Sequence, residues 1–505
     1  MQFGLTLKDN WCSFAKKVPI TDYTDWRRWI SPSHVNQPSS LCSSPTQRHQ
    51  PTSGSTSAIK WIPYSRRFLS EINAALLPWM SEIYTTHPET RSGHHYWSVS
   101  WVPTALRGEV NENINDDLNV LPWWERWFVA QYMAVPETVA QAETSDDTLF
   151  ASLAWLVKRS DLSFISVWSP TFALTLIQKI KFYREELIEV LTRGDWLSRT
   201  KSLRFTPCPK DPSRAALLRQ TKDFTESQFL TELWPKLSLI SCWETSSSKK
   251  SAVELQKYFP RARMEGKGLW ATEGVVTIPF AGKYPLAVNS HYYEFLDIDS
   301  SIVVPSWQLE KGMNVSPILT TGSGFLRYKL NDKLLVSGFF NETPCFEFKG
   351  RIDGTDLAGE KLSSQAAQSI IELFSNNRNL NPITLLAIPG VFDSKDKARE
   401  KGRYILLCEL TAEHIDSNES STFLENSLSK YFHYKLAREL NQLDSARVVV
   451  TDRAFEIYQY RCEQRGMSQG NIKIEPLVLW DTELHPVLES NLTLYNKEHW
   501  KYHVM

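Results

Sequence analysis

The chain has 505 residues, which is too long for one hydrophobic core and enough for about two to four domains. Apolar residues make up 42 % of it, so a packed core is expected and disorder over the whole chain is excluded. Because 56 Lys and Arg residues balance 57 Asp and Glu residues, the charge gives no argument for a nucleic-acid or anionic-membrane partner.

The 7 cysteines are dispersed and show no Cys-x-x-Cys spacing, which predicts free thiols in a reducing compartment and neither a disulfide framework nor a zinc site. Residues 1–17 lack the apolar core of a signal peptide. No apolar run approaches the ~18 residues that a membrane span needs. We therefore expect a cytoplasmic protein without a membrane partner.

Residues 31–58 are rich in Ser, Pro, Thr and Gln and predict a loop or poorly ordered segment. The end of this segment is suited to holding a phosphate. Gly54 lets the backbone approach an anion, Lys60 adds a positive charge, and backbone N–H groups in such a turn can bind an anion. Hydroxyl donors are supplied by Ser53, Ser55, Thr56 and Ser57. A solvated hydroxyl-rich loop is the alternative interpretation. A Walker A loop is excluded, because no second glycine precedes Lys60 and Trp61 follows it.

A helix is expected over about 66–84 and a strand over 96–101. His94 and His95 precede this strand and would face opposite sides of it, so we expect them to be structural rather than metal ligands. Residues 146–158 have helical periodicity, and 162–168 read as a buried strand. Ser169 and Pro170 then suit the start of a helix that runs to Arg193 and ends at Gly194.

A second unit of the same kind follows, with a strand at 237–243, a helix at 248–259 and a strand at 263–270. Strand, helix and strand at this spacing predict βαβ units and a mainly parallel sheet. Residues 286–348 instead predict the antiparallel strands of a small sheet or barrel. Beyond residue 353 we expect an α+β domain with strands near 383–388, 403–410 and 445–451, and helices near 363–376, 421–440 and 452–465.

Three further stretches carry groups for nucleotide chemistry. Thr272 and Glu273 stand at the end of the strand predicted for 263–270, where ligands bind in open α/β sheets. Glu273 could hold Mg²⁺, which prefers carboxylate and phosphate oxygens. Asp332 is expected in a turn after a strand, where a carboxylate can accept the ribose hydroxyls. Arg351 lies in Gly350-Arg351-Ile352-Asp353, at the proposed domain joint.

The order and spacing of these stretches resemble the acyl-adenylate-forming superfamily, and within it the auxin-conjugating acyl acid amido synthetases and their bacterial relatives. Residues 52–60 are similar to the phosphate loop, 270–273 to the Tyr-x-x-Ser/Thr-Glu motif and 328–332 to the Tyr-Arg-Val-Gly-Asp motif. The likeness covers nearly the whole chain. This sequence departs from the pattern at Ser55, Trp270, Lys329 and Asn331, which leaves nucleotide affinity open while Lys60, Glu273 and Asp332 are retained.

The resemblance implies an α/β fold. A large N-terminal adenylation domain, residues 1–353, would combine βαβ sheets with a small barrel-like β subdomain, and a smaller mobile α+β domain, residues 354–505, would follow. It also implies ATP and Mg²⁺ as cofactors. A carboxylic acid would be activated as acyl-AMP with release of pyrophosphate, and an amine, such as an amino acid, would then take the acyl group to form an amide.

In this scheme residues 53–57 with Lys60 would hold the leaving pyrophosphate, Glu273 the metal, and Asp332 the ribose, while Thr272 and Arg351 would contact the nucleotide. Asp353 resembles the hinge, and Lys473 is the candidate for a transition-state lysine, with a surface lysine as the alternative.

The acid is expected near Trp97, Trp101 and Trp168, which would equally suit the hydrophobic core. Two other functions stay open, a ligase that uses coenzyme A or a carrier thiol as acceptor, and a drifted nucleotide-binding scaffold. A monomer is the default expectation.

Overall fold

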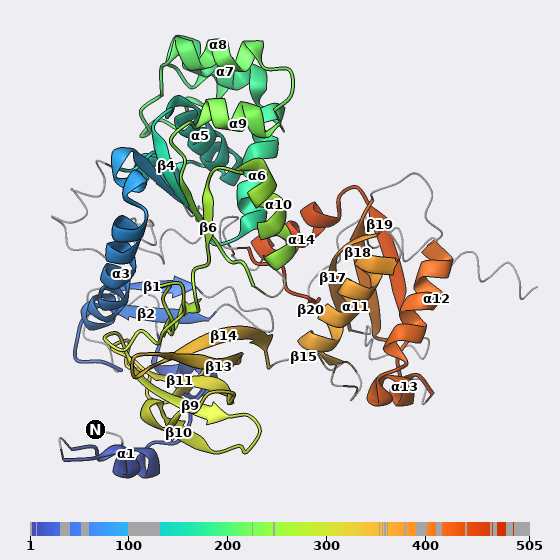
Figure 1. The fold of residues 1–505 in the computed structure, drawn as a ribbon. Coiled ribbons are helices and arrows are strands. Elements are labelled where there is room, and N and C mark those ends of the chain that lie inside the picture. The colour runs from blue at the N-terminus through green and yellow to red at the C-terminus, as the bar shows by residue number, and fades with distance from the viewer. Residues whose placement is uncertain are drawn as a thin grey trace, which may run out of the picture. The chain divides into compact units, whose positions relative to one another are not determined.

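A computed structural model describes the fold (Figure 1) over most of the chain. The residues described are 3–6, 8–30, 41–51, 60–98, 132–224, 226–245, 248–352, 354–355, 357, 360, 362–377, 380–389, 401–410, 417–439, 442–464, 467, 472–480 and 488. They divide into two compact units. The first holds the described residues up to Lys349 together with 467 and 472–473, and the second holds those from Gly350 to 464 and from Ile474 onward.

The first unit contains a four-stranded parallel sheet in the order β3-β4-β5-β6. Its strands are β3 (His94–Trp97), β4 (Leu162–Ser166), β5 (Leu239–Ser241) and β6 (Arg263–Glu265). Every residue of β4 is buried, as expected for a parallel strand with covered faces. Helix α10 (Lys249–Tyr258) connects β5 to β6. The predicted βαβ organisation is therefore confirmed.

Helices lie between these strands in the chain (Figure 1). Together with the parallel sheet they enclose one hydrophobic core. They are α5 (Ser145–Lys158), α6 (Pro170–Phe182), α7 (Arg184–Arg193), α8 (Pro212–Gln220) and α9 (Ser227–Leu233), with short 3₁₀ turns η5 (Glu137–Gln141) and η6 (Leu197–Arg199). The single helix predicted for 170–193 is wrong, because Tyr183 leaves helical geometry at φ −92° and ψ 13° and divides it. Gly194 ends α7 in the left-handed conformation at φ 80°, as predicted.

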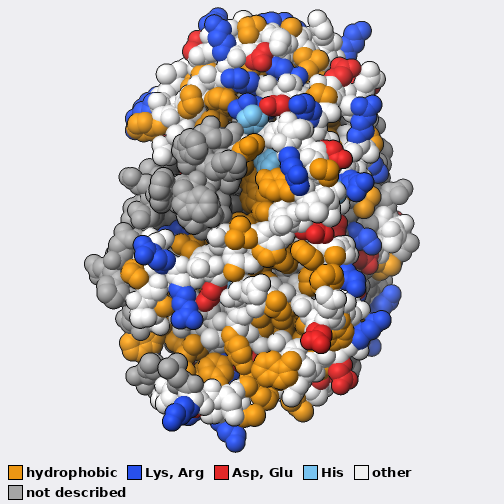
Figure 2. All heavy atoms as spheres, turned by 60° about the vertical axis from the view of Figure 1, so that its left-hand side comes forward, with side chains coloured by type: hydrophobic (Ala, Val, Ile, Leu, Met, Phe, Trp, Pro, Cys, Tyr) orange, Lys and Arg blue, Asp and Glu red, His pale blue; other side chains and the backbone are white. Residues whose placement is uncertain are grey.

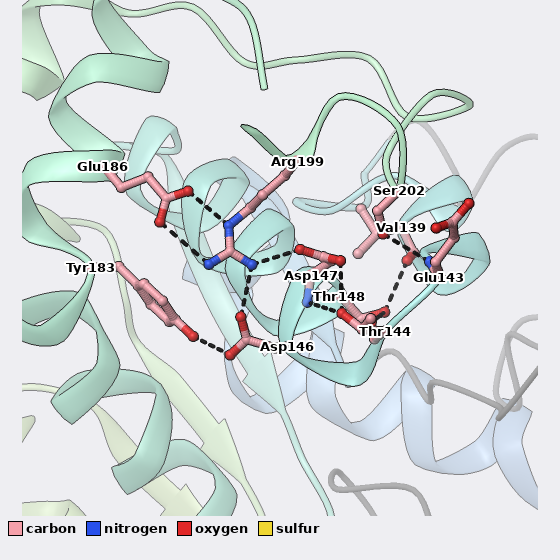
Figure 3. Close-up of polar contacts among 10 residues, drawn as sticks. All are labelled: Val139, Glu143, Thr144, Asp146, Asp147, Thr148, Tyr183, Glu186, Arg199 and Ser202. Atoms are coloured by element: carbon pink, nitrogen blue, oxygen red, sulfur yellow. Dashed lines mark hydrogen bonds and ion pairs between the residues drawn. The ribbon is translucent and has the colours of Figure 1, made fainter. Parts of the chain in front are cut away.

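Arg199 ties these helices together (Figure 3). Its guanidinium donates to Asp146 at 2.7 Å and Asp147 at 2.6 Å, both in the first turn of α5. It also donates to Glu186 of α7 at 2.8 Å. Tyr183, at the break between α6 and α7, donates its hydroxyl proton to Asp146. One cation thus joins the turn η6 to two helices.

The N-terminal part holds α1 (Trp11–Lys17), α2 (Tyr23–Trp26), the turn η1 (Arg27–Trp29) and the long helix α3 (Arg66–Thr86), followed by the 3₁₀ turn η2 (Pro88–Ser92). Strands β1 (Thr46–Pro51) and β2 (Trp61–Ser65) pair antiparallel. The loop predicted for 31–58 is therefore wrong over 46–51, where backbone pairing with β2 overrides a polar composition. The predicted helix over about 66–84 is confirmed by α3.

A six-stranded antiparallel sheet completes the first unit, as predicted for 286–348. Its order is β10-β9-β11-β13-β14, and β12 also pairs with β11. The strands are β9 (Tyr292–Asp297), β10 (Val303–Pro305), β11 (Asn314–Thr320), β12 (Tyr328–Lys329), β13 (Asp332–Phe340) and β14 (Thr343–Arg351), with the turn η8 (Ser306–Gln308). A second hydrophobic cluster joins this sheet to α3.

The second unit has a mixed four-stranded sheet in the order β19-β18-β17-β20, with its own core. The strands are β17 (Asn381–Ile388), β18 (Arg403–Glu409), β19 (Arg447–Thr451) and β20 (Leu477–Leu479). Helix α11 (Ser364–Asn377) packs on β17 and α12 (Ser417–Leu428) on β19. The remaining elements are α13 (Phe432–Glu439), α14 (Ala454–Gln464) and the short strands β15 (Gly354–Thr355) and β16 (Leu362–Ser363). The predicted α+β elements are present, and β20 is an addition.

On the face drawn in Figure 2, basic and acidic side chains are interspersed rather than gathered by sign. Among the described helices, none combines the length and the hydropathy that crossing a membrane requires.

Candidate active site

Thr272 and Glu273 form the tip of a β-hairpin. Strands β7 (Trp270–Ala271) and β8 (Gly274–Val275) pair antiparallel, with Ala271 opposite Gly274. The strand predicted for 263–270 is wrong as a single element, because β6 ends at Glu265 and β7 belongs to a separate two-stranded sheet. A Cβ at Gly274 would lie 2.9 Å from His291 Nε2, so only glycine fits against that ring. The two-residue turn holds the Glu273 carboxylate at a defined place.

A buried histidine fixes this hairpin to helix α3. The backbone N–H of Val275 donates to His291 Nε2 at 3.1 Å. Since Nε2 accepts, the proton is assigned to Nδ1, which donates to Glu71 Oε2 at 2.9 Å. The same Glu71 oxygen accepts the N–H of Gly322 at 2.7 Å. The His291 side chain is fully buried and stacks on Phe68. We call Glu71, His291 and Val275 the hairpin latch.

Two tyrosines from other parts of the chain contact the hairpin. Tyr328, which opens the third motif, donates its hydroxyl to Glu273 Oε1 at 3.4 Å. Tyr64, on the strand that follows the hydroxyl-rich loop, donates to the Thr272 carbonyl at 3.1 Å. Burial raises the pKa of Tyr328, and the charge of Glu273 raises it further, so Tyr328 remains a neutral donor. The second and third motifs therefore meet at one carboxylate.

Lys60 lies beside an N-terminal segment that sequence reasoning missed. Its Nζ stands 5.8 Å from the ring centroid of Tyr23, whose hydroxyl accepts the N–H of Trp61 at 2.8 Å. Burial raises the pKa of Tyr23, and the charge of Glu273 adds to this effect. A hydrogen bond from Thr24 lowers the pKa of Asp22, with a smaller contribution from Lys60. No motif in the sequence marks these N-terminal residues.

The N-terminal segment reaches the third motif through backbone pairing. Thr21 N donates to the Arg327 carbonyl, and Lys329 N donates to the Thr21 carbonyl, both at 2.9 Å. Arg327 is buried, pairs with Glu294 at 2.8 Å and donates to the Val18 carbonyl at 2.7 Å. The hydrogen bond to Val18 and the backbone pairing of Thr21 fix the chain that carries Tyr23 against the strand that carries Tyr328.

Asp332 is the first residue of β13 and is half-buried. Strands β12 and β13 both pair with β11, and only Leu330 and Asn331 interrupt them. The turn expected there is therefore wrong. The motif lies where the pairing of this part of the chain with β11 is interrupted. The break is anchored because Ser316 Oγ donates to the Leu330 carbonyl at 2.6 Å.

Tryptophans line the carboxyl end of the parallel sheet. Trp270 lies 5.9 Å from Trp79 and 6.0 Å from Trp168, measured between ring centroids. Trp97 lies 6.0 Å from Trp79, and Trp243 lies 5.7 Å from Trp168. We call these residues the tryptophan cluster. Trp97 and Trp168, two of the expected pocket residues, thus belong to one cluster that includes the residue three positions before Glu273.

Lys473 borders the tryptophan cluster. Its Nζ is 5.4 Å from the ring centroid of Trp243 and 4.6 Å from that of Phe348. Lys473 is half-buried and lies in a segment grouped with the first unit. A lysine held over two aromatic rings differs from the solvated surface lysine that was the alternative.

Several expected site residues lie outside the described residues: Ser53, Gly54, Ser55, Thr56, Ser57, Trp101 and Asp353. Arg351 ends β14, and only its backbone is described. Among the described residues, no group of three or more His, Cys, Asp or Glu side chains is arranged to hold a metal ion.

Three models of one protein family match this chain. The GH3 family N-terminal domain matches residues 2–264, the GH3 family central domain 284–351, and the GH3 family C-terminal domain 387–482. The indole-3-acetic acid-amido synthetase GH3.15 of Arabidopsis thaliana is 22 % identical over 525 residues, which cover 95 % of this chain and 87 % of that protein.

A second relative, the 4-substituted benzoates-glutamate ligase GH3.12 of Arabidopsis thaliana, is 21 % identical over 444 residues, covering 81 % of this chain and 75 % of that protein. The solved structure named AtGH3.15 acyl acid amido synthetase in complex with 2,4-DB superposes with a TM-score of 0.73 at 19 % identity. The superposition covers 95 % of this chain and 88 % of that one. The predicted α/β fold class is confirmed.

Proposed function

The chain belongs to the GH3 family, and we propose on this basis that it is an AMP-forming amido synthetase. It activates a carboxylic acid with ATP, releases pyrophosphate and passes the acyl group to an amine to form an amide. The observation that supports this most is the meeting of the second and third motifs, where Tyr328 donates to Glu273. Tyr64, on the strand that follows the phosphate loop, contacts Thr272 of the same hairpin.

In the first half-reaction a carboxylate oxygen attacks the α-phosphorus of ATP, and the bond to pyrophosphate breaks. Lys60, with the hydroxyls and N–H groups of residues 53–57, holds the departing pyrophosphate. Asp332 accepts hydrogen bonds from the ribose hydroxyls, and Thr272 and Arg351 contact the nucleotide. Lys473 stabilises the charge that develops on the phosphate. Each of these roles is a proposal for this chain.

Mg²⁺ is proposed as the metal that accompanies ATP. The Glu273 carboxylate is half-buried at the hairpin tip, and Tyr328 donates to one of its oxygens. A single carboxylate together with phosphate oxygens is an ordinary donor set for Mg²⁺, so the residue fits the ion. When bound, the ion supplies charge neutralisation and orientation at the phosphates.

In the second half-reaction an amine nitrogen attacks the acyl carbon, and AMP leaves as the amine loses one proton. The names of the two relatives, an acid-amido synthetase and a benzoates-glutamate ligase, favour an amine acceptor over a thiol. We retain a domain boundary after residue 353, with Asp353 as the hinge, within the same proposal.

The identity of the acyl acceptor distinguishes an amido synthetase from the alternative function, a ligase that uses a thiol. Purified protein is incubated with ATP, Mg²⁺ and an acid that supports turnover, together with either pooled amino acids or coenzyme A. Mass spectrometry then identifies the acyl product. We expect an amide in the first incubation and no thioester in the second. A thioester without an amide would show that the protein is an acyl-thiol ligase and not an amido synthetase.

A further inference from the structure

Tyr23 places a phenol hydroxyl beside the residue that ends the phosphate loop. The residue is only 9 % exposed and belongs to the hydrophobic cluster that joins α3 to the antiparallel sheet. Its hydroxyl oxygen accepts the backbone N–H of Trp61, the residue directly after Lys60, at 2.8 Å. This hydrogen bond fixes the phenol oxygen at the point where strand β2 begins. The roles proposed above do not use Tyr23.

The proton of this hydroxyl has no acceptor among the residues that the structure describes. Accepting from Trp61 occupies a lone pair of the phenol oxygen and leaves its O–H able to donate. Burial raises the pKa of Tyr23, so the hydroxyl keeps its proton and remains a neutral donor. A donor that lacks an acceptor in a nearly buried residue is costly, and it points to a ligand that accepts hydrogen bonds.

Two charged groups of the proposed site lie near this hydroxyl. The Nζ of Lys60 is 5.8 Å from the ring centroid of Tyr23, within reach of a cation–π attraction. The carboxylate of Glu273 is close enough for its charge to add to the rise in the pKa of Tyr23. Tyr23 is therefore a neighbour of both the lysine proposed for the pyrophosphate and the carboxylate proposed for Mg²⁺.

The carboxylate next to Tyr23 in the chain is held by its own turn. Asp22 accepts the N–H of Thr24 at 2.7 Å and the Thr24 hydroxyl at 2.5 Å. The hydrogen bond from the Thr24 hydroxyl is the main cause that lowers the pKa of Asp22, and Lys60 contributes least. Among the described residues, no carboxylate forms an ion pair with Lys60. A cation and a hydroxyl donor therefore lie side by side, and an anion with several acceptor oxygens is the complementary ligand.

We propose that the Tyr23 hydroxyl donates a hydrogen bond to the phosphate chain of ATP, at the β and γ phosphates that leave as pyrophosphate. This inference rests on the proposed function and adds a residue to its phosphate site. Tyr23 stays protonated throughout, and no proton is transferred. Lys60 supplies charge, while Tyr23 supplies a directed neutral donor. Negative charge grows on the pyrophosphate as its bond to the α-phosphorus breaks, so a donor already fixed in place stabilises its departure.

Nucleotide binding tests the inference without turnover. Isothermal titration calorimetry measures the affinities for ATP and for AMP, with Mg²⁺ present and no acid. AMP lacks the β and γ phosphates, so the ratio of the two affinities reports the contacts to those phosphates. Tyr23→Phe removes the hydroxyl and keeps the ring. Tyr458→Phe is the matched control, because the Tyr458 hydroxyl also accepts a backbone N–H, that of Glu475 at 3.1 Å in the second unit.

Tyr23→Phe should weaken ATP binding about 10- to 100-fold, as expected for a hydrogen bond to a charged group, and should leave AMP binding unchanged. The control should bind both nucleotides like wild type. Equal ATP affinity in wild type and Tyr23→Phe would overturn the inference. An equal loss of ATP and AMP binding would overturn it too, because it would show a general structural role.

The Lys60→Met background separates direct contact from positioning of Lys60. If Tyr23 acts only by holding Lys60 in place, Tyr23→Phe causes no further loss of ATP affinity once Lys60 is replaced. We expect the double variant to bind ATP several-fold more weakly than Lys60→Met alone. An unchanged affinity in the double variant would contradict a contact between the hydroxyl and the phosphates.

The proposed function fails separately. Acid-dependent pyrophosphate release by wild type, with a KM for ATP that does not change in Tyr23→Phe, would support the synthetase and exclude Tyr23 from phosphate binding. ATP binding that depends on the Tyr23 hydroxyl, without pyrophosphate release for any acid, would support the phosphate contact and exclude the synthetase.

Discussion

At the scale of single residues, Lys60, Glu273 and Asp332 are identifiable from motifs because each motif is contiguous in sequence. Tyr23 and His291 are not. Tyr23 reaches Lys60 through a fold in the N-terminal segment. His291 takes its partner Glu71 and its neighbour Phe68 from helix α3, far away in sequence. A side chain whose role depends on long-range packing leaves no local pattern to find.

Lys473 carries the prediction that belongs to this scale. Lys473→Ala should lower the rate of acyl-AMP formation by about 10²–10³-fold, the usual loss for one preorganised transition-state donor. The protein should still fold, and its melting temperature should fall by only a few degrees. Lys473 is half-buried, and its loss removes two cation–π contacts that each contribute about 0.5–1 kcal/mol. Lys430→Ala, at an exposed position just after α12, is the control. Near-normal adenylation in the Lys473 variant would remove this lysine from the chemistry.

At the scale of elements, the hairpin depends on the latch rather than on its own sequence. Strands of two residues cannot be stable alone, and the His291 ring supplies the acceptor for Val275. The prediction of a single strand over 263–270 missed this break. Gly266 and Gly268 allow the chain to leave the parallel sheet between β6 and β7, Gly268 at φ +72°.

His291→Phe tests the latch. The buried N–H of Val275 then loses its acceptor, which costs about 1–3 kcal/mol of unfolding free energy. Because β8 carries the far side of the Glu273 turn, acid-dependent pyrophosphate release should fall along with stability. His291→Gln, which restores an acceptor at the same reach, should recover both. A Phe variant as active and stable as wild type would show that the hairpin is held by other contacts.

The ion pairs of Arg199 with Asp146, Asp147 and Glu186 connect helices and involve none of the proposed site residues (Figure 3). We call them the Arg199 network. Arg199→Met leaves three carboxylates without their shared cation and should cost about 2–3 kcal/mol, less than a fully buried pair because the Arg199 side chain is 15 % exposed. Arg193→Met, which breaks the exposed pair with Glu189, should cost less than about 1 kcal/mol. Chemical unfolding compares the two variants.

The same network predicts an acid dependence. Burial alone would raise the pKa of Asp147, but hydrogen bonds from Ser202, Thr144 and Arg199 outweigh burial and lower it. Since the folded pKa lies below the unfolded value of about 3.9, this stabilisation is present above pH ~4 and is lost as pH falls further. The stability difference between wild type and Arg199→Met should therefore hold down to about pH 4 and shrink between about pH 4 and pH 2. A difference that is constant over this range would exclude the Asp147 contribution.

At the scale of the whole molecule, periodicity and spacing predict the parallel sheet, the antiparallel sheet and the C-terminal α+β elements because each burial pattern is regular along the chain. The elements that the sequence did not predict depend on contacts between residues far apart in the chain. Strand β1 is polar and forms by pairing with β2, and Tyr183 interrupts a helical pattern while its ring packs on Phe150 and its hydroxyl on Asp146. Strand β20 is only three residues long and is specified by β17.

The most direct test of the account is pyrophosphate release from ATP and Mg²⁺ with pooled carboxylic acids, with AMP and ADP separated in the same sample. Wild type should release pyrophosphate and AMP together only when an acid is present, and Glu273→Gln should lose most of this activity while keeping its fold. Release of ADP, or ATP binding without pyrophosphate release for any acid, would contradict the assignment of this chain as an amido synthetase.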